Sequence, residues 1–293
     1  MLKSIVVTFN FTVMPELPEV ETIRLELQDE IIGKEIKSVD VLSKKQFFGN
    51  PKTLTGKKIK KVDRTGKIIN ILLNDGTFIN IHLKLTGQIL FAPDMSHAVF
   101  KNIIPFTATN QMPCKTTRII VYFKDGSGFF FNDLRKFAWM KINTHPEGPK
   151  SIDVLSPDFT LDYFQKTVTS SKRPIKILLM DQEKMAGIGN IYANEALFIA
   201  RISPERRTNS LNENEIKNLY EAIKQVIREG IKYKGSSAAD EAYITPKGKK
   251  GEMQNHFRVY QKEGQKCPKG CGGIVKRIKQ GGRSSFFCPN CQS

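Results

Sequence analysis

Long hydrophobic runs and acidic charge are both scarce in this chain of 293 residues. No apolar run approaches the roughly 18 residues that a membrane-spanning helix requires, so the sequence predicts no membrane association. Acidic residues number 29 against 46 lysines and arginines, which leaves a net charge of +17. A surplus of that size favours a polyanionic partner. Nucleic acid is the first candidate, because each cation–phosphate contact releases a condensed counterion, and a solvated basic surface is the alternative.

Cysteine is also rare, and four of the five cysteines fall in the last 27 residues. Cys267 and Cys271 form one close pair, and Cys288 and Cys291 form a second pair after sixteen intervening residues. This spacing favours one structural, tetrahedral Zn²⁺ with four thiolate ligands over a secreted disulfide framework. Two disulfides or accidental clustering are the alternatives. Cys114 stands apart and is interpreted as an ordinary thiol. A reducing, intracellular compartment (the cytoplasm or nucleoid) is expected.

Hydrophobic periodicity predicts a helix followed by a β-rich domain. Apolar residues at Val20, Ile23, Leu27 and Ile31 follow helical spacing, and Gly33 suits the end of that helix. Short runs separated by Asp-Gly turn signals then indicate a β-sandwich that extends to about residue 141. The predicted strands lie in the runs 59–62, 68–73, 78–83, 119–123 and 129–131.

The second half of the chain is predicted to be helical. A stretch rich in Pro and Gly at 145–149 indicates a linker. Asp158 is expected to cap a helix that runs through Val168, and Pro174 to open the next helix. The longest helix is expected at 213–232. Asn190 is expected to cap a further helix, and the glycines before it suit an anion-binding turn. A plain turn is the more common meaning of such glycines.

The opening Met14-Pro15-Glu16-Leu17-Pro18-Glu19-Val20-Glu21-Thr22 carries a possible catalytic amine. A proline that follows Met becomes the N-terminal residue once Met is removed, and an α-amino group has a pKa of about 8. Such a secondary amine can attack a sugar C1′ and form an iminium. Glu16 beside it can act as acid or base. A helix entry without chemistry is the alternative.

On the strength of this opening motif and the motifs that follow it, the sequence from Met14 to its end resembles the formamidopyrimidine-DNA glycosylase family. The Leu17-Pro18 pair resembles this family rather than its endonuclease VIII branch. The other matching motifs, in order, are Arg64-Thr65-Gly66-Lys67, His82-Leu83-Lys84-Leu85-Thr86-Gly87, Asp133-Leu134-Arg135-Lys136-Phe137, the run 187–195, and the cysteine module with Arg283.

The resemblance implies an α+β multidomain fold and a DNA-repair activity. The implied fold has an N-terminal β-sandwich with a leading helix, a helix–two-turn–helix domain and a C-terminal zinc-finger hairpin, with duplex DNA between the lobes. The implied activity is excision of 8-oxoguanine and formamidopyrimidines, followed by β,δ-elimination. We expect these domain limits: an extension at 1–13, the catalytic domain at 14–144, a linker at 145–156, the DNA-binding domain at 157–255 and the zinc finger at 256–293.

The resemblance also assigns roles to single residues. Pro15 is the implied nucleophile, Glu16 protonates the sugar ring oxygen or shuttles protons, and Lys67 belongs with them at the catalytic centre. The implied phosphate-contacting residues are Lys67, His82, Lys176, Asn190 and Arg283. The residues implied to fill the gap left by the everted base are Leu85, Arg135 and Phe137, which suits the use of apolar wedges in a base stack.

Several positions depart from the family pattern. Leu85 stands where relatives often have Met, Lys84 replaces a usual Gly, and Leu134 and Lys136 replace Pro and Arg. Glu252-Met253 stands where relatives often carry an aromatic residue, which puts one phosphate contact in doubt.

Residues 1–13 raise a separate question, because Pro15 nitrogen is a non-nucleophilic tertiary amide while they remain attached. We therefore expect Met14 to be the true start. A damage-binding protein without catalysis is one alternative, and specificity for oxidised pyrimidines is another. A monomer without a small-molecule cofactor is expected.

Overall fold

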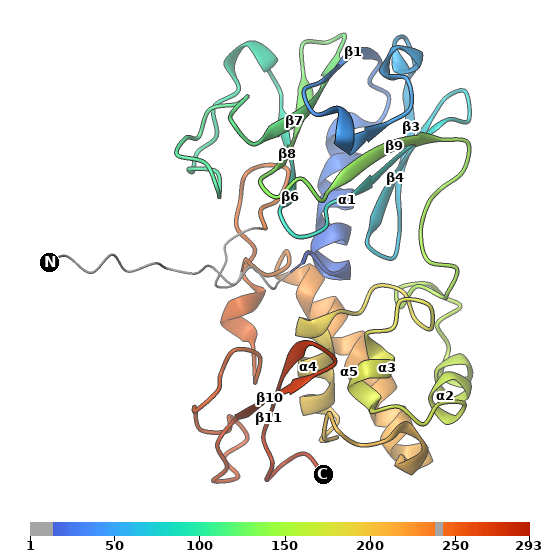
Figure 1. Ribbon diagram of the computed structural model, residues 1–293, viewed down its shortest axis with the longest axis vertical. Coiled ribbons are helices and arrows are strands. Elements are labelled where there is room, and N and C mark those ends of the chain that lie inside the picture. The colour runs from blue at the N-terminus through green and yellow to red at the C-terminus, as the bar shows by residue number, and fades with distance from the viewer. Residues whose placement is uncertain (1–13, 238–242) are drawn as a thin grey trace, which may run out of the picture.

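The computed structural model describes residues 14–237 and 243–293. The expected extension, residues 1–13, lies outside the described residues. Figure 1 shows two lobes, one rich in strands and one rich in helices, with helix α1 (Leu17–Ile31) reaching from one into the other. Within the described ranges, no helix is both long and apolar enough to cross a membrane.

The N-terminal lobe is a β-sandwich of two sheets, as predicted. One sheet has the strand order β1-β7-β8-β6, and the other has the order β2-β9-β5-β4-β3. All neighbouring pairs are antiparallel except β2 with β9. The strands are β1 (Ile36–Val41), β2 (Phe47–Phe48), β3 (Ile59–Thr65), β4 (Ile68–Leu73), β5 (Phe78–His82), β6 (Gly87–Ala92), β7 (Thr117–Phe123), β8 (Gly128–Asp133) and β9 (Trp139–Asn143).

Helix α1 links the cores of the two lobes. Val20, Ile23, Leu27 and Ile31 are buried in the cluster between the sheets, where each contributes about 2 kcal/mol by its removal from water. Leu17, at the start of the same helix, is buried instead in the core of the helical lobe. The first turn of α1 is therefore held where the two lobes meet.

The second lobe packs four helices and a hairpin around one core. The hairpin pairs β10 (Lys276–Gln280) with β11 (Arg283–Phe287). The helices are α2 (Leu161–Thr169), α3 (Ile175–Leu179), α4 (Asn190–Ile199) and α5 (Glu213–Lys232). Among the described residues of both lobes, the short 3₁₀ turns are Lys44–Gln46, Pro51–Leu54, Met95–His97, Thr208–Ser210 and Met253–His256. The longest helix has the predicted bounds, and Pro174 precedes α3 as expected.

Two predicted helix caps are wrong by one or two residues. The N-cap of α2 is Thr160, whose side chain accepts a hydrogen bond from Tyr163 N, whereas Asp158 lies in the preceding turn. The N-cap of α4 is Gly189, so Asn190 is its first helical residue. At α4 another side chain takes the capping role.

Candidate active site

Glu16 lies at the N-terminus of α4 and accepts hydrogen bonds from its free N–H groups. Its Oε1 is 2.9 Å from Ile191 N, and its Oε2 is 3.4 Å from Tyr192 N. These are the donors that an N-cap side chain normally satisfies, and the positive end of the helix favours a carboxylate there. Glu16 therefore caps α4 from the preceding lobe, which explains why Asn190 does not.

The two glycines before α4 are required by this close approach. A Cβ at Gly189 would lie 2.2 Å from Cδ of Glu16, and a Cβ at Gly187 would lie 2.2 Å from Cδ1 of Leu17. Gly187 O also accepts a hydrogen bond from Leu17 N at 3.2 Å. The sequence predicts an anion-binding turn here, and the anion at the N–H groups of Ile191 and Tyr192 is the carboxylate of Glu16.

Glu16 and Glu19 share a buried, polar setting beneath Pro15, which is itself buried. Burial raises the pKa of the Glu16 carboxyl, while Lys67 and the α4 N–H groups oppose that rise. Burial and the nearby Glu16 raise the pKa of Glu19 to about 7. Glu19 accepts from Glu16 N at 2.9 Å and from the Tyr192 hydroxyl at 2.7 Å. It also accepts a backbone N–H at residue 236 at 2.8 Å.

Lys67 reaches the same centre from the turn between β3 and β4. It is only 9% exposed, and its Nζ donates to Ile188 O at 3.2 Å. Burial lowers the pKa of Lys67, Glu16 and Glu19 counteract that change, and Arg283 adds to it. The structure therefore brings Glu16 and Lys67 together, within electrostatic reach of Arg283.

An ion-pair network fixes this turn between the lobes. Arg64 donates to Glu21 of α1 at 2.9 Å and, through its two terminal nitrogens, to both oxygens of Asp153. It also donates to Gly66 O at 2.7 Å, while Gly66 N donates to Asp153 at 2.8 Å. Because the Arg64 side chain is 5% exposed, this network is shielded from water. Residues of both lobes thus hold Lys67 in place.

Lys176 and Arg283 belong to the second lobe. Lys176 is fully buried, and its ammonium donates to Ser284 O and Ser285 Oγ, both at 2.7 Å. Burial lowers the pKa of Lys176 to about 7. Arg283 begins β11 and, with Asn190, lines a cavity of about 550 Å³. Lys176 thus anchors the strand that carries Arg283, and the cavity has a basic wall.

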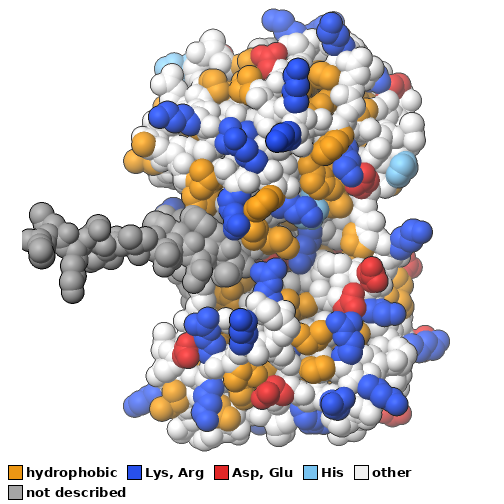
Figure 2. Space-filling view, viewed as in Figure 1, with side chains coloured by type: hydrophobic (Ala, Val, Ile, Leu, Met, Phe, Trp, Pro, Cys, Tyr) orange, Lys and Arg blue, Asp and Glu red, His pale blue; other side chains and the backbone are white. Residues whose placement is uncertain are grey.

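The remaining predicted DNA-contacting residues lie at the end of β5 and on the loops that follow β5 and β8. His82 Nδ1 accepts from Lys84 N at 3.0 Å, which leaves Nε2–H as a donor. Burial lowers the pKa of His82 to about 3, so the ring stays neutral. Leu85 is half-buried, and Phe137 is 54% exposed with the Arg135 guanidinium 5.0 Å from its ring centroid. Figure 2 shows Lys and Arg side chains over both lobes and across the waist between them.

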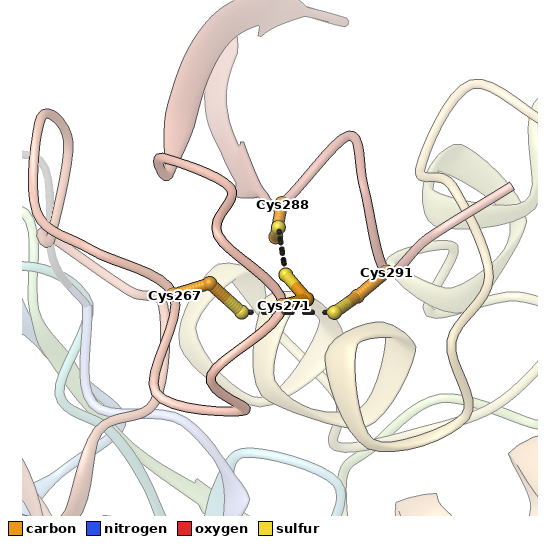
Figure 3. A group of neighbouring side chains, drawn as sticks. All are labelled: Cys267, Cys271, Cys288 and Cys291. Atoms are coloured by element: carbon orange, nitrogen blue, oxygen red, sulfur yellow. Dashed lines mark hydrogen bonds between the residues drawn. The ribbon is translucent and has the colours of Figure 1, made fainter.

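The four C-terminal cysteines converge, as their spacing predicts. Their Sγ atoms all lie within 4.8 Å of one another, and they point toward one centre in Figure 3. Sγ of Cys267 lies 3.7 Å from that of Cys291, and Sγ of Cys271 lies 3.5 Å from that of Cys288. A tetrahedron with Zn–S bonds of about 2.3 Å has edges near 3.8 Å, so the donor set fits one Zn²⁺. With four thiolates as ligands, such an ion is structural and leaves no position for a reacting water.

Comparisons with known proteins cover almost the whole chain. The family model for the formamidopyrimidine-DNA glycosylase N-terminal domain matches residues 14–140, that for the H2TH domain of the same glycosylase matches 151–242, and that for the zinc finger found in FPG and IleRS matches 264–293. A formamidopyrimidine-DNA glycosylase of Pelotomaculum thermopropionicum is 37% identical over 95% of this chain and 99% of its own length. The chain belongs to the formamidopyrimidine-DNA glycosylase family.

Other members of the family agree in sequence and structure. The formamidopyrimidine-DNA glycosylase of Listeria monocytogenes is 36% identical over 95% of this chain and all of its own length. The crystal structure of MutM (Fpg) from Thermus thermophilus matches with a TM-score of 0.80 and 34% identity, over 95% of this chain and 98% of that one. A complex of Lactococcus lactis Fpg with DNA containing an abasic site matches with a TM-score of 0.80 and 30% identity, over 95% of this chain and 100% of that one. The predicted fold class and the structural zinc site are therefore confirmed.

Sequence reasoning missed two buried carboxylates of this glycosylase, Glu19 and Glu195. Glu19 belongs to the opening motif, but motif matching gives it no role, although it lies on the same helix face as Ile23 and Leu27, where a carboxylate needs partners. Glu195 is a similar case, since its buried carboxylate accepts three backbone N–H groups from 258–260. The helical period indicates both positions, but it does not reveal the partners, which are distant in sequence.

Proposed function

We propose that this chain is a bifunctional base-excision enzyme that removes oxidised purines, 8-oxoguanine and formamidopyrimidines, from duplex DNA and then cleaves the strand. The observation that carries the proposal is the buried carboxylate of Glu16, which adjoins Pro15, sits on the N-terminus of α4 and lies in the field of Lys67. The site thus holds two buried carboxyl groups, Glu16 and Glu19, a buried lysine and one candidate amine, the groups that acid–base and amine chemistry require. Family relatives bound to lesion-containing or abasic DNA support duplex DNA as the partner.

The reaction begins with the amine of Pro15, freed when the chain starts at Met14 and Met14 is removed. The nitrogen lone pair forms a bond to sugar C1′ as the bond from C1′ to the base breaks, and the departing base takes up the proton that the nitrogen loses. Glu16 supplies a proton to the sugar ring oxygen, which opens the ring and leaves an iminium between Pro15 and C1′. Removal of a C2′ proton then expels the 3′ phosphate, and removal of the C4′ proton expels the 5′ phosphate. Water finally hydrolyses the iminium, which releases the sugar fragment and frees the amine of Pro15.

The surrounding cations hold the DNA in place while this occurs. Lys67 assists proton transfer beside Glu16, and it contacts phosphate together with Lys176, His82, Asn190 and Arg283. Structural Zn²⁺ holds the hairpin that carries Arg283. Leu85, Arg135 and Phe137 fill the stack position of the everted base. We further propose a monomer that acts on chromosomal DNA, with functional domains at 14–144, 157–255 and 256–293.

Borohydride trapping tests the nucleophile. The chain begun at Met14 is incubated with a duplex that carries 8-oxoguanine opposite cytosine, is reduced with borohydride, and is mapped by mass spectrometry. We expect one cross-link at Pro15. The chain begun at Met1 is the matched control: intact mass gives its N-terminus, and a form that keeps residues 1–13 should bind without cross-linking.

Other outcomes separate the alternatives. Tight binding of lesion DNA without a cross-link or strand cleavage would favour a damage-binding protein without catalysis. Cross-linking that appears only with an oxidised-pyrimidine duplex would favour the endonuclease VIII-like specificity. A cross-link at a lysine instead of Pro15 would overturn the assignment of the amine while leaving the reaction class intact.

A further inference from the structure

A buried carboxylate joins the two loops that carry the predicted gap-filling residues. Leu85 lies on the loop between β5 and β6, while Arg135 and Phe137 lie on the loop between β8 and β9. Asp133, the last residue of β8, stands between these loops and is 1% exposed. In the described part of the chain, no lysine or arginine forms an ion pair with it, and the partners of its side chain are hydrogen-bond donors.

The hydrogen bonds of Asp133 come from both loops and from the chain behind them. Oδ1 accepts from the Thr86 hydroxyl and from Arg135 N, the latter at 3.1 Å. Oδ2 accepts from Ala138 N and from Gln46 Nε2, both at 2.9 Å. A buried carboxylate with four donors is well compensated, and each of these bonds is stronger than one between neutral groups.

Thr86 connects the two loops directly. Its hydroxyl donates to Asp133 and accepts from Arg135 N at 3.0 Å, so the residue after Leu85 is tied directly to the residue that carries the guanidinium. The backbone at Arg135 is therefore fixed by two acceptors at once. The Arg135 guanidinium then lies over the exposed ring of Phe137.

We propose that Asp133 and Thr86 are positioning residues that lock the two loops into one preformed wedge. The inference rests on the proposed function, because the wedge needs a base to displace. Loops ordered in advance lose less entropy when they enter the DNA stack, and the benefit is confined to the step in which a paired base leaves it. Asp133 and Thr86 touch neither the sugar nor the phosphates in this scheme.

The experiment compares two substrates and three variants in the chain begun at Met14. Thr86→Val removes the hydroxyl at nearly constant shape, Thr86→Ser keeps it, and Asp133→Asn replaces an acceptor with a donor that faces Arg135 N or Ala138 N. The substrates are a duplex with 8-oxoguanine opposite cytosine and the same duplex with a preformed abasic site. Asp94→Asn is the control, because that exposed carboxylate makes only local bonds to Ser96.

We expect Thr86→Val and Asp133→Asn to slow single-turnover excision of the paired lesion roughly tenfold to a hundredfold, the loss that follows removal of one or two bonds to a charged group. Cleavage at the abasic site should change by less than about threefold, since no base remains to be displaced. Thr86→Ser should retain most of the excision rate. In a Phe137→Ala background, Thr86→Val should add little, because the exposed ring that the locked loops present to the stack is already gone.

The single tryptophan, Trp139, follows this loop and gives an independent signal. Binding of the abasic duplex should change its fluorescence in the wild type and change it less in Thr86→Val. Equal losses on both substrates, full additivity with Phe137→Ala, or an unaltered fluorescence change in Thr86→Val would overturn the proposal. If the wild type cleaves neither duplex, the proposed function fails, and the fluorescence comparison still decides whether Thr86 positions the loop.

Discussion

Replacing Gly189 by alanine tests whether the position of Glu16 determines the reactivity of the site. The new Cβ would lie 2.2 Å from Cδ and 2.5 Å from Oε1 of Glu16, far inside van der Waals contact. The carboxylate must then move by about 1 Å or more and give up its hydrogen bonds to Ile191 N and Tyr192 N. A displacement of that size at a reacting group lowers the rate about a hundredfold. Overpacking of this kind also lowers the free energy of unfolding by about 1–3 kcal/mol.

We therefore expect Gly189→Ala to reduce single-turnover excision of 8-oxoguanine about a hundredfold or more while DNA affinity changes little. The assay is quenched-flow excision under enzyme excess, with affinity measured by fluorescence anisotropy. Gly126→Ala is the matched control: Gly126 has φ +89° in an exposed turn with open space around it, so alanine there costs stability through strain alone. If both variants lose the same stability and neither loses excision, the carboxylate is not position-critical and the reasoning fails.

Three further predictions follow from the contacts between the lobes, the titration of Glu19 and the zinc site. Arg64→Met should lower the free energy of unfolding by about 3 kcal/mol, because Asp153, whose side chain is only 15% exposed, is left without its partner. Arg173→Met at a more exposed pair should cost less than about 1 kcal/mol. Urea unfolding compares the two variants, and equal losses would contradict the stabilising role of the Arg64 network. The folded-state pKa of Glu19 is raised from 4.5 to about 7, so its stabilising contribution is complete below about pH 4.5 and is lost as pH rises to about 7. Glu19→Gln should therefore flatten the dependence of the free energy of unfolding on pH in that window. An unchanged slope would count against the raised pKa of Glu19. Chelation of zinc should unfold the cysteine module and weaken DNA binding, and added Zn²⁺ should restore the fold and the affinity. If protein that elemental analysis shows to be zinc-free binds DNA with unaltered affinity, the prediction is wrong.

The elements that periodicity predicted well are those with one buried face. Helix α5 has the predicted bounds because its apolar residues recur at helical spacing along its whole length and Asn212 caps it locally. Strand β4 also matches its predicted run. Strand β6 was not among the predicted runs, and the structure gives the reason: Ile89 and Phe91 face the sandwich core while Leu90 and Ala92 face a separate outer cluster, so the strand shows no alternation.

The parts of the site that sequence could not supply are contacts between distant segments. The cap of α4 was assigned to Asn190 because a local rule considers only neighbouring residues, whereas the acceptor is Glu16, 175 positions away along the chain. The same holds for Asp133, whose partners Gln46 and Thr86 lie 87 and 47 positions away. Motif matching gives Glu16 a role, but only the fold shows that burial raises the pKa of its carboxyl while Lys67 and the N–H groups of α4 oppose that rise.

This division of the site has a consequence for how activity depends on folding. Glu16 comes from the start of α1, Lys67 from a sandwich turn, the capping N–H groups from α4 and Arg283 from the zinc hairpin, so neither lobe alone brings Glu16, its capping groups and Lys67 together. The buried Arg64 network is then the contact that couples lobe docking to chemistry, since it fixes the turn of Lys67 against Asp153. A change that loosens the lobes should therefore remove excision before it unfolds either core, because the two cores are separate clusters joined by α1.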